Sequence, residues 1–211
     1  MTRITRAVRH LARDKGITQF LDIGTGVPTS PNVHETAAEH AVGTRVVYAD
    51  NDPVVHAHAN TLLTGTGATS IILADLRDPA SIIGGAGEFL DFTNPVGLLL
   101  VAILHFIPDE DDPAGIVATF RDTLAPGSCL VLSHRTTDFH PAEVAGTAMA
   151  AYDAAVAPLV LRSRTAIEPF LDGFTPEDPG LVQVPLWRPD AKPKRGDLKK
   201  IGMYAAVAAK S

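Results

Sequence analysis

The sequence has one cysteine, few aromatic side chains and no apolar run long enough to cross a bilayer. Cys129 alone excludes an intramolecular disulfide framework and a CxxC metal or redox motif, and it fits a reducing compartment. Aromatic residues make up 6% and charged residues 20% of the 211 positions, while 45% are apolar. No stretch reaches the ~18–20 apolar residues of a membrane helix. These features predict one globular, cytoplasmic domain over residues 1–211.

Positive charge is scarce outside one short segment. The formal net charge is −6, yet residues 188–200 carry a local +4, which leaves −10 for the rest of the chain. Phosphate backbones need a cationic protein face, and most of this chain would repel one. We therefore expect no nucleic acid partner. The segment 188–200, with Pro189 and Pro193, is open to two interpretations, a small anion-binding patch or a solvated loop.

Apolar runs of Val, Ile and Leu alternate with helix-length segments over the first two thirds of the chain. Runs that are apolar at every position predict strands buried on both faces, which is typical of parallel sheets. Ile4, Val8 and Leu11 recur at helical spacing and predict a first amphipathic helix. The expected strands cover 19–23, 45–49, 69–74, 96–104 and 128–133, and the expected helices between them cover 31–42, 53–63, 78–84 and 112–124.

The last third of the chain has a different pattern. The segment 141–159 predicts a long Ala-rich helix, and 165–173 predicts a shorter one that ends at a glycine. Two more strands are expected at 181–187 and 201–209, and consecutive strands without a helix between them most simply pair antiparallel. The whole pattern predicts a doubly wound, Rossmann-like α/β fold. Its mostly parallel sheet has seven strands with an antiparallel C-terminal strand, and helices cover both faces.

The predicted parallel strands end in glycine or acidic residues at regular intervals. Gly24, Asp50 and Asp75 follow the first three strands, 26 and 25 residues apart, which is one strand and one return helix each. Their carboxyl ends therefore meet at one edge of the sheet, where open α/β sheets bind ligands. The turn from Gly24 to Gly26 also lets the backbone approach a ligand closely.

The acidic residues at this edge suit a nucleoside. Asp50 can accept hydrogen bonds from both hydroxyls of a ribose, and Asn51 can reach the same sugar or the base. Asp75 can accept from an exocyclic amine while the Leu76 N–H donates to the neighbouring ring nitrogen, which is the edge pattern of adenine. The alternatives are that Asp50 is only a loop residue and that Asp75 caps the next helix. Thr29 replaces the third glycine of the dinucleotide fingerprint, which argues against NAD.

Two histidines follow the fourth and fifth predicted strands at the same edge. His105 and His134 are the candidate catalytic residues, because a histidine can orient a substrate or act as a general base near neutral pH. The alternative, a packed structural role, stays open for both, and His140 is a third candidate base. His56 and His58 would face different directions on their helix, so we expect no metal site.

Together these residues resemble the class I S-adenosylmethionine-dependent methyltransferases. The glycine turn, Asp50, Asp75 with Leu76, the LHFIPD segment and the two closing strands match that family's motifs in order. The chain is more narrowly similar, from about residue 6 onward, to a bacterial methyltransferase family long carried as a domain of unknown function. The segments that carry this narrower resemblance are FLDIGTGVPT, NVHE, VVYADNDPVV, LADLRDP, LHFIPDEDDP, PGSCLVLSH and PGLVQVPLWRP.

The resemblance implies a site for S-adenosylmethionine. It would place the methionyl group over Gly24, Thr25 and Gly26 with Asp22 in the same site, the ribose at Asp50, the adenine near Asn51, Asp75 and Leu76, and the cofactor's ammonium at the carbonyl near Ala102. The acidic edge suits this cationic cofactor. Members of the narrower family usually carry a further N-terminal segment, and we expect this chain to lack that part of the cover.

The predicted activity is methyl transfer from S-adenosylmethionine to a small-molecule acceptor. Such an enzyme must place the nucleophile in line with the methyl group and exclude water. Residues 134–175 would build the acceptor pocket, with Phe139, Met149, Tyr152 and Phe170 as apolar lining. The alternatives are a non-catalytic module that binds S-adenosylmethionine and an NAD-dependent oxidoreductase.

Overall fold

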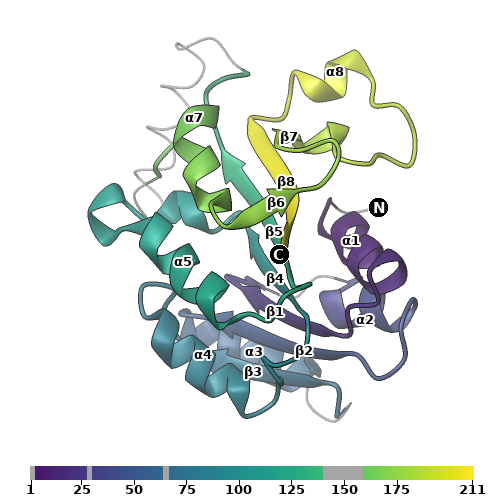
Figure 1. Cartoon of the computed structure of the whole chain (residues 1–211), viewed down its shortest axis with the longest axis vertical. Coiled ribbons are helices and arrows are strands. Elements are labelled where there is room, and N and C mark those ends of the chain that lie inside the picture. The colour runs from purple at the N-terminus through teal and green to yellow at the C-terminus, as the bar shows by residue number, and fades with distance from the viewer. Residues whose placement is uncertain (1–2, 28–29, 64–66, 140–158) are drawn as a thin grey trace.

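The computed structural model describes residues 3–27, 30–63, 67–139 and 159–211, which carry one mixed sheet of eight strands (Figure 1). The strand order is β3-β2-β1-β4-β5-β8-β6, and β7 also pairs with β8. The strands are β1 (Gln19–Ile23), β2 (Arg45–Asp50), β3 (Thr69–Leu73), β4 (Val96–Val101), β5 (Cys129–Arg135), β6 (Phe174–Pro176), β7 (Val182–Gln183) and β8 (Met203–Lys210). The first five pair in parallel and β8 pairs antiparallel to β5, which confirms the predicted fold class.

The helices alternate with the parallel strands, as predicted. They are α1 (Arg3–Arg9), α2 (Val33–Ala38), α3 (Pro53–Leu63), α4 (Pro79–Gly87), α5 (Pro113–Thr123), α7 (Arg164–Ile167) and α8 (Arg195–Leu198). A π-helical turn at His10–Asp14 continues α1, and short 3-10 helices cover Leu104–Phe106, Asp109–Asp111, Glu168–Leu171 and Val184–Leu186. The helix expected at 141–159 lies almost wholly outside the described residues.

Two of the predicted strands are shorter than expected. The run at 96–104 leaves the ladder after Val101, because Ala102 has a left-handed φ of 59°. The run stays apolar because Leu104 is buried in the core beyond the strand. The strand expected at 181–187 is only Val182–Gln183, since a 3-10 helix begins at Val184 and its second residue, Pro185, has no N–H to donate to a strand.

The strand β6 at Phe174–Pro176 was not predicted, and it follows the segment 165–173 that was expected to be a helix. Both β6 and β7 pair antiparallel with successive parts of β8. Phe174 opens β6 directly after Gly173, where φ is +80° and the predicted helix 165–173 has ended. The sheet therefore has eight strands in place of the expected seven.

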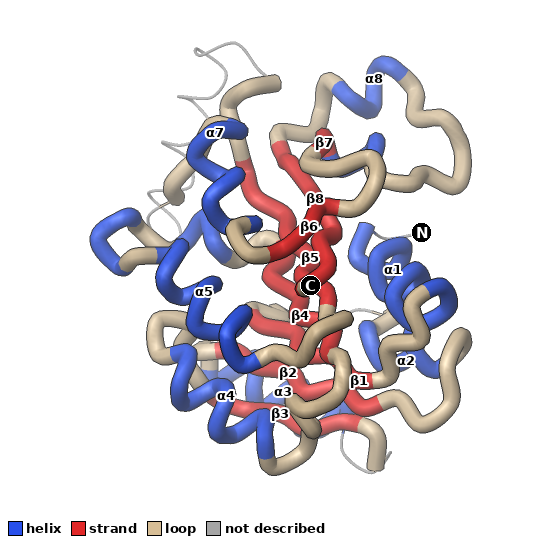
Figure 2. The backbone as a smooth tube through the Cα atoms, in the orientation of Figure 1, coloured by secondary structure: helices blue, strands red, loops and turns tan. Residues whose placement is uncertain are grey.

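Two apolar layers bury the sheet, one on each face (Figure 2). Side chains of α4, α5 and α7 cover one face, where Ile82, Phe120 and Ile167 pack on the strands. Side chains of α1, α2 and α3 cover the other face and enclose Phe20 of β1 and Val46 of β2. Burial on both faces explains why the parallel strands are apolar at almost every position.

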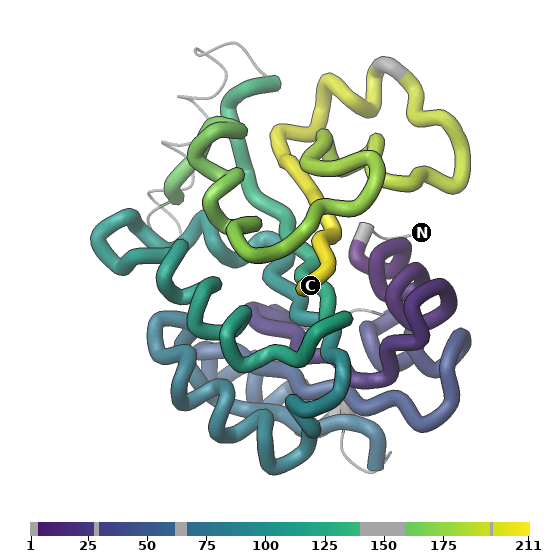
Figure 3. Tube along the Cα trace, in the orientation of Figure 1, coloured from purple at the N-terminus to yellow at the C-terminus, as the bar shows by residue number. Residues whose placement is uncertain are grey.

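The first helix packs against the C-terminal part of the chain, far from it in sequence (Figure 3). The Arg6 Nη2 donates a hydrogen bond to the Val184 carbonyl at 3.1 Å, and Arg9 forms an ion pair with Asp190 at 2.5 Å. The basic segment 188–200 is thus anchored to α1 near its start.

The described residues on both sides of 140–158 lie side by side. The Arg162 N–H donates to the Arg135 carbonyl at 3.4 Å, and the Arg164 N–H donates to Asp138 Oδ2 at 2.8 Å. The chain therefore returns at 159–164 to the end of β5 that it left. None of the helices in the described part of the chain is long and apolar enough to cross a bilayer.

The contact between β1 and β4 leaves no room for a side chain at Gly97. A Cβ there would lie 2.8 Å from the Phe20 ring and 3.1 Å from the Leu11 side chain. We expect Gly97→Ala to lower the free energy of unfolding by about 1–3 kcal/mol through overpacking. Gly84→Ala is the matched control, since a Cβ at this exposed position in α4 meets nothing within 4 Å. It should raise stability by about 0.5–1 kcal/mol. Urea unfolding measures both, and equal effects would contradict the packing argument.

Candidate active site

A cavity of about 550 Å³ opens where β1, β2, β3 and β4 end. This volume falls within the range of about 300–1,000 Å³ that is typical of small-molecule sites. Seven of the nine predicted cofactor-binding residues line it, and Asp22 and Thr25 do not. The seven are Gly24, Gly26, Asp50, Asn51, Asp75, Leu76 and Ala102. Arg77, Ile103, Phe106 and Ile107 complete much of the wall, and the sequence motifs gave none of these four a contact with the ligand.

The glycine turn after β1 is shaped by close contacts on one side and open space on the other. Gly24 has a φ of 72°, its N–H donates to the Ala49 carbonyl at 2.8 Å, and a Cβ would lie 2.5 Å from the Ile103 side chain. Gly26 has a φ of 61°, and a Cβ there would meet no protein atom within 4 Å. Backbone is therefore exposed to the cavity where a ligand can lie against it.

Asp50, at the end of β2, is held by two backbone groups. The Gly26 N–H donates to Asp50 Oδ2 at 2.9 Å, and the Asp52 N–H donates to Asp50 Oδ1 at 3.0 Å. A carboxylate has about four acceptor positions, two on each oxygen. One position on each oxygen is left, so this carboxylate can accept from two neighbouring hydroxyls of one ligand.

Asp75, after β3, already has all its acceptor positions in use. Arg77 donates to it from the backbone N–H at 2.9 Å, from Nε at 3.0 Å and from Nη2 at 2.6 Å. Asn51 Nδ2 donates to Oδ2 at 3.1 Å. The hydrogen bonds from Arg77 hold the pKa of Asp75 well below its ordinary value. The N–H of Leu76, in contrast, has no acceptor among the described residues, so it is ready to donate to a ligand.

Asp22 is buried in β1 beneath the glycine turn. Burial raises its pKa to about 7, and the negative charge of Asp50 contributes in the same direction. A hydrogen bond from the Thr25 side chain lowers the pKa and only partly offsets the other effects. Asp22 and Thr25 therefore support the turn from behind the wall of the cavity.

Ala102 stands where β4 leaves the sheet. Its φ of 59° is uncommon for a residue with a Cβ and indicates local strain. The Ala102 N–H is shared between the Ser133 Oγ at 3.0 Å and the Ser133 carbonyl at 3.2 Å. No donor within the described residues reaches the Ala102 carbonyl, so it is free to accept from a ligand.

The two candidate catalytic histidines are buried and do not line this cavity. They also do not line a second, smaller cavity between α1, β5 and β8. Their rings meet edge to face at 5.6 Å. Burial lowers the pKa of His105 to about 3 and that of His134 to about 4. A base with so low a pKa is a weak proton acceptor, which disfavours general-base catalysis by either ring.

Arg162 holds His134 in place, and sequence reasoning missed it. The arginine is 5% exposed, and its Nη1 donates to His134 Nε2 at 3.0 Å. Because a guanidinium only donates, His134 Nε2 accepts, and Nδ1 donates to the Arg135 carbonyl at 2.7 Å. The same guanidinium donates to the carbonyls of Leu104 and Ile107, so it fixes the segment that forms one wall of the cavity.

Arg162 also bonds Asp109 at the outer end of that segment. Its Nη2 lies 2.5 Å from Asp109 Oδ1. The only sequence signal for this role was an arginine directly after the apolar residues 159–161, in a chain with few other cationic side chains. A buried arginine of this kind needs several acceptors to offset its desolvation, and the backbone after β4 supplies two of them.

The expected acceptor pocket at 134–175 can be followed only in part. Phe139 packs on Tyr204, with ring centroids 4.6 Å apart, and Phe170 packs beside His134 and Arg162. Neither phenylalanine lines the cavity at the sheet edge or the smaller cavity between α1, β5 and β8. His140, Met149 and Tyr152 lie outside the described residues. In the part of the chain that the structure describes, no three His, Cys, Asp or Glu side chains are grouped as a metal site would require.

Solved structures of two bacterial proteins resemble this chain over 99% of its length. A DUF574 family protein from Streptomyces avermitilis shares 45% identity, with 81% of its own chain covered and a TM-score of 0.91. A candidate methyltransferase from Thermobifida fusca shares 32% identity, with 79% of its chain covered and a TM-score of 0.91. No curated protein matches the chain.

The similarity to a third solved structure shows a shared fold and nothing more. The N-methyltransferase NodS from Bradyrhizobium japonicum, in complex with S-adenosyl-L-homocysteine, shares 15% identity over 98% of this chain and 85% of its own, with a TM-score of 0.60. The model of the S-adenosyl methyltransferase family matches residues 2–211. The chain therefore belongs to the family of S-adenosylmethionine-dependent methyltransferases, as the motifs at the sheet edge predicted.

Proposed function

We propose that the cavity at the carboxyl edge of the sheet binds S-adenosylmethionine and that the chain transfers its methyl group to a small-molecule acceptor. The observation that carries this proposal is Asp50, whose two oxygens each keep one open acceptor position beside the open side of Gly26. That arrangement fits two vicinal ribose hydroxyls. The acidic edge further suits a cofactor with a sulfonium and an ammonium group.

The remaining groups fit the other parts of the cofactor. The Leu76 N–H would donate to an adenine ring nitrogen, and the Ala102 carbonyl would accept from the ammonium. Asp75 can accept from the adenine amine once Arg77 releases it, and Arg77 is more than half exposed. Such exposed ion pairs contribute only about 0.2–1 kcal/mol, so this release costs little.

Bound in this way, the cofactor supplies an electrophilic methyl group, and the chain's task is to orient it and exclude water. We assign no proton transfer to His105 or His134. Their burial and the bond from Arg162 support a positioning role, in which His134 anchors the guanidinium that fixes the cavity wall. We also propose a single domain and a cytoplasmic setting, which the family match over 2–211 and the buried, free Cys129 support.

Removal of the Asp50 carboxylate tests the proposal directly. We expect Asp50→Ala to weaken S-adenosylhomocysteine binding at least about 30-fold, because hydrogen bonds to a charged group are worth about 1.5–3 kcal/mol each. Isothermal titration calorimetry gives the affinities, with NAD as a comparison ligand. Asp122→Ala removes the same charge from an exposed position late in α5 and should stay within twofold of wild type. Binding of NAD without S-adenosylhomocysteine would overturn the proposal.

Removal of Arg77 tests the assignment of adenine to Asp75. Arg77→Ala frees the carboxylate in advance, so we expect S-adenosylhomocysteine to bind up to about fivefold more tightly, which corresponds to about 1 kcal/mol. Arg13→Ala is the control, because Arg13 is another exposed arginine paired with a nearby carboxylate. The same calorimetric titration applies. Weaker binding in Arg77→Ala would mean that Arg77 itself contacts the cofactor.

The raised pKa of Asp22 predicts a pH-dependent stability. The folded state favours the protonated form of Asp22, and this contribution to stability is fully present below the ordinary pKa of an aspartate, about 4. It is lost as the pH rises through the raised pKa of about 7. Asp22→Asn cannot ionise. The stability of Asp22→Asn relative to wild type should therefore rise by up to about 4 kcal/mol from pH 4 to pH 7 and then level off, because each pKa unit corresponds to about 1.4 kcal/mol. Urea unfolding at several pH values measures the difference, and parallel stability curves would refute the assignment.

A further inference from the structure

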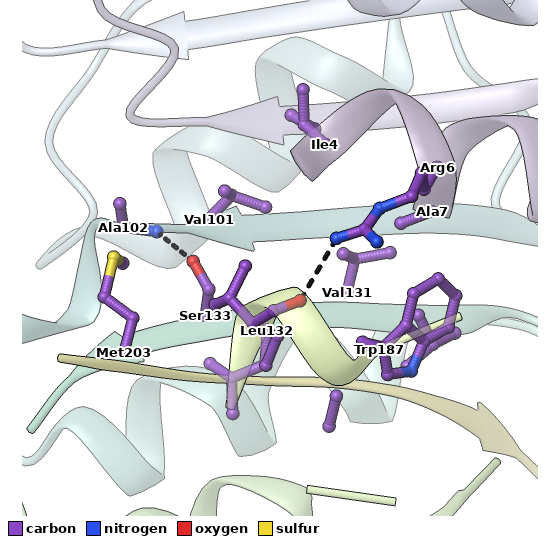
Figure 4. Close-up of a pocket in the computed structure, with 14 residues that line it drawn as sticks. Ile4, Arg6, Ala7, Val101, Ala102, Val131, Leu132, Ser133, Trp187 and Met203 are labelled. Carbon is purple, nitrogen blue, oxygen red and sulfur yellow. Dashed lines mark hydrogen bonds between the residues drawn. The ribbon is translucent and has the colours of Figure 1, made fainter. Parts of the chain in front are cut away.

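A second, smaller cavity of about 140 Å³ lies between α1, β5 and β8 (Figure 4). Its wall is almost entirely apolar, with Val131, Val184 and Ala205 among the lining side chains. A cavity of about 150 Å³ lined by apolar groups is large enough to hold a benzene ring. The space therefore matches a compact ring in size and polarity.

This cavity meets the cofactor cavity at Ala102, which lines both. Figure 4 shows Ala102, Ser133 and Met203 at one end and Arg6 and Trp187 at the other. A molecule seated here would thus have one end at the shared wall, where the methyl group would have to arrive. Its other end would lie against Trp187 and Arg6.

The far end carries a polar group that needs a partner. Trp187 is 3% exposed, and its indole Nε1–H has no acceptor among the described residues. A buried donor without an acceptor costs about 1–3 kcal/mol. The guanidinium of Arg6 lies at the same end, where its Nη2 donates to the Val184 carbonyl at 3.1 Å. The unpartnered indole N–H favours an oxygen acceptor on the molecule that fills the cavity, and the guanidinium adds positive charge at the same end.

We propose that this cavity is the methyl-acceptor subsite and that it takes a compact aromatic molecule with a carbonyl or carboxylate oxygen facing Trp187. The opposite edge of the ring would present the nucleophile at Ala102 and Ser133. This inference rests on the proposed function, since it makes the second cavity the neighbour of the methyl donor.

The sequence contains a single tryptophan, so one indole N–H resonance reports on this site alone. With S-adenosylhomocysteine bound, we expect titration with benzoate or acetophenone to shift that resonance in ¹⁵N-labelled protein in a saturable manner. Toluene has the same ring and no oxygen, so it should bind at least fivefold more weakly. An indole resonance that stays unchanged at saturating benzoate and acetophenone would overturn the proposal.

Two variants test whether benzoate binds in this cavity or elsewhere on the molecule. Ala205→Leu fills part of this cavity, and Ala205 is not among the residues that line the cofactor cavity. It should weaken benzoate binding at least tenfold and leave S-adenosylhomocysteine binding within twofold of wild type. Ala80→Leu, at an exposed position in α4, should change neither. Unchanged benzoate binding in Ala205→Leu would place the probe elsewhere and refute the subsite.

Trp187→Phe keeps an aromatic wall, removes the indole N–H and enlarges the cavity, and the comparison of benzoate with toluene controls for the enlargement because both probes gain the same space. Ligand-observed NMR should then show a preference for benzoate over toluene that is at least threefold smaller than in wild type, and a preference of unchanged size would exclude Trp187 as the donor. The two hypotheses fail in different ways. If wild-type protein does not bind S-adenosylhomocysteine, the proposed function fails, whereas loss of the indole shift alone rejects only the acceptor subsite.

Discussion

The pairing of β1 with β4 between two apolar layers determines where every group at the site lies. Leu21 pairs with Leu98 in this register, and Phe20 crosses Gly97 too closely for any side chain there. A shift of one residue would exchange the two faces of a strand. The glycine turn and the segment after Val101 both start within a few residues of this pair. The shape of the cavity is therefore a consequence of core packing.

Three carboxylates near one edge have three different environments, and each environment follows from the backbone around it. Asp22 lies within a strand, so it is desolvated and its pKa is raised. Asp50 ends a strand and is oriented by N–H groups of two turns. Asp75 begins a loop, where an exposed arginine two residues later can reach it. The same residue type thus has three roles. Asp22 supports the glycine turn from the interior, Asp50 is an acceptor already oriented by the backbone, and Asp75 is an acceptor whose partner can be exchanged.

The sequence was sufficient for the fold class and for bringing together most of the residues that line the cavity at the sheet edge. Apolar runs and return helices are local patterns, and in a parallel sheet they determine which strand ends share an edge. The end of β4 could not be predicted in this way, because Leu104 stays apolar after the strand has ended. The burial of His134 depends on Arg162, a partner 28 residues later in the chain. Long-range contacts of this kind leave no periodic signal, so the sequence alone did not predict that both histidines are buried.

The hydrogen bonds that join Arg162 to Arg135 and Arg164 to Asp138 close the chain on itself at the end of β5. The entropy cost of a closed loop rises only with the logarithm of its length, by about 0.6 kcal/mol for each doubling. Residues inserted or deleted between these anchors would therefore change global stability little. A change in the number of residues between the anchors would thus leave the strands, the glycine turn and Arg162 in place, and with them the cavity at the sheet edge.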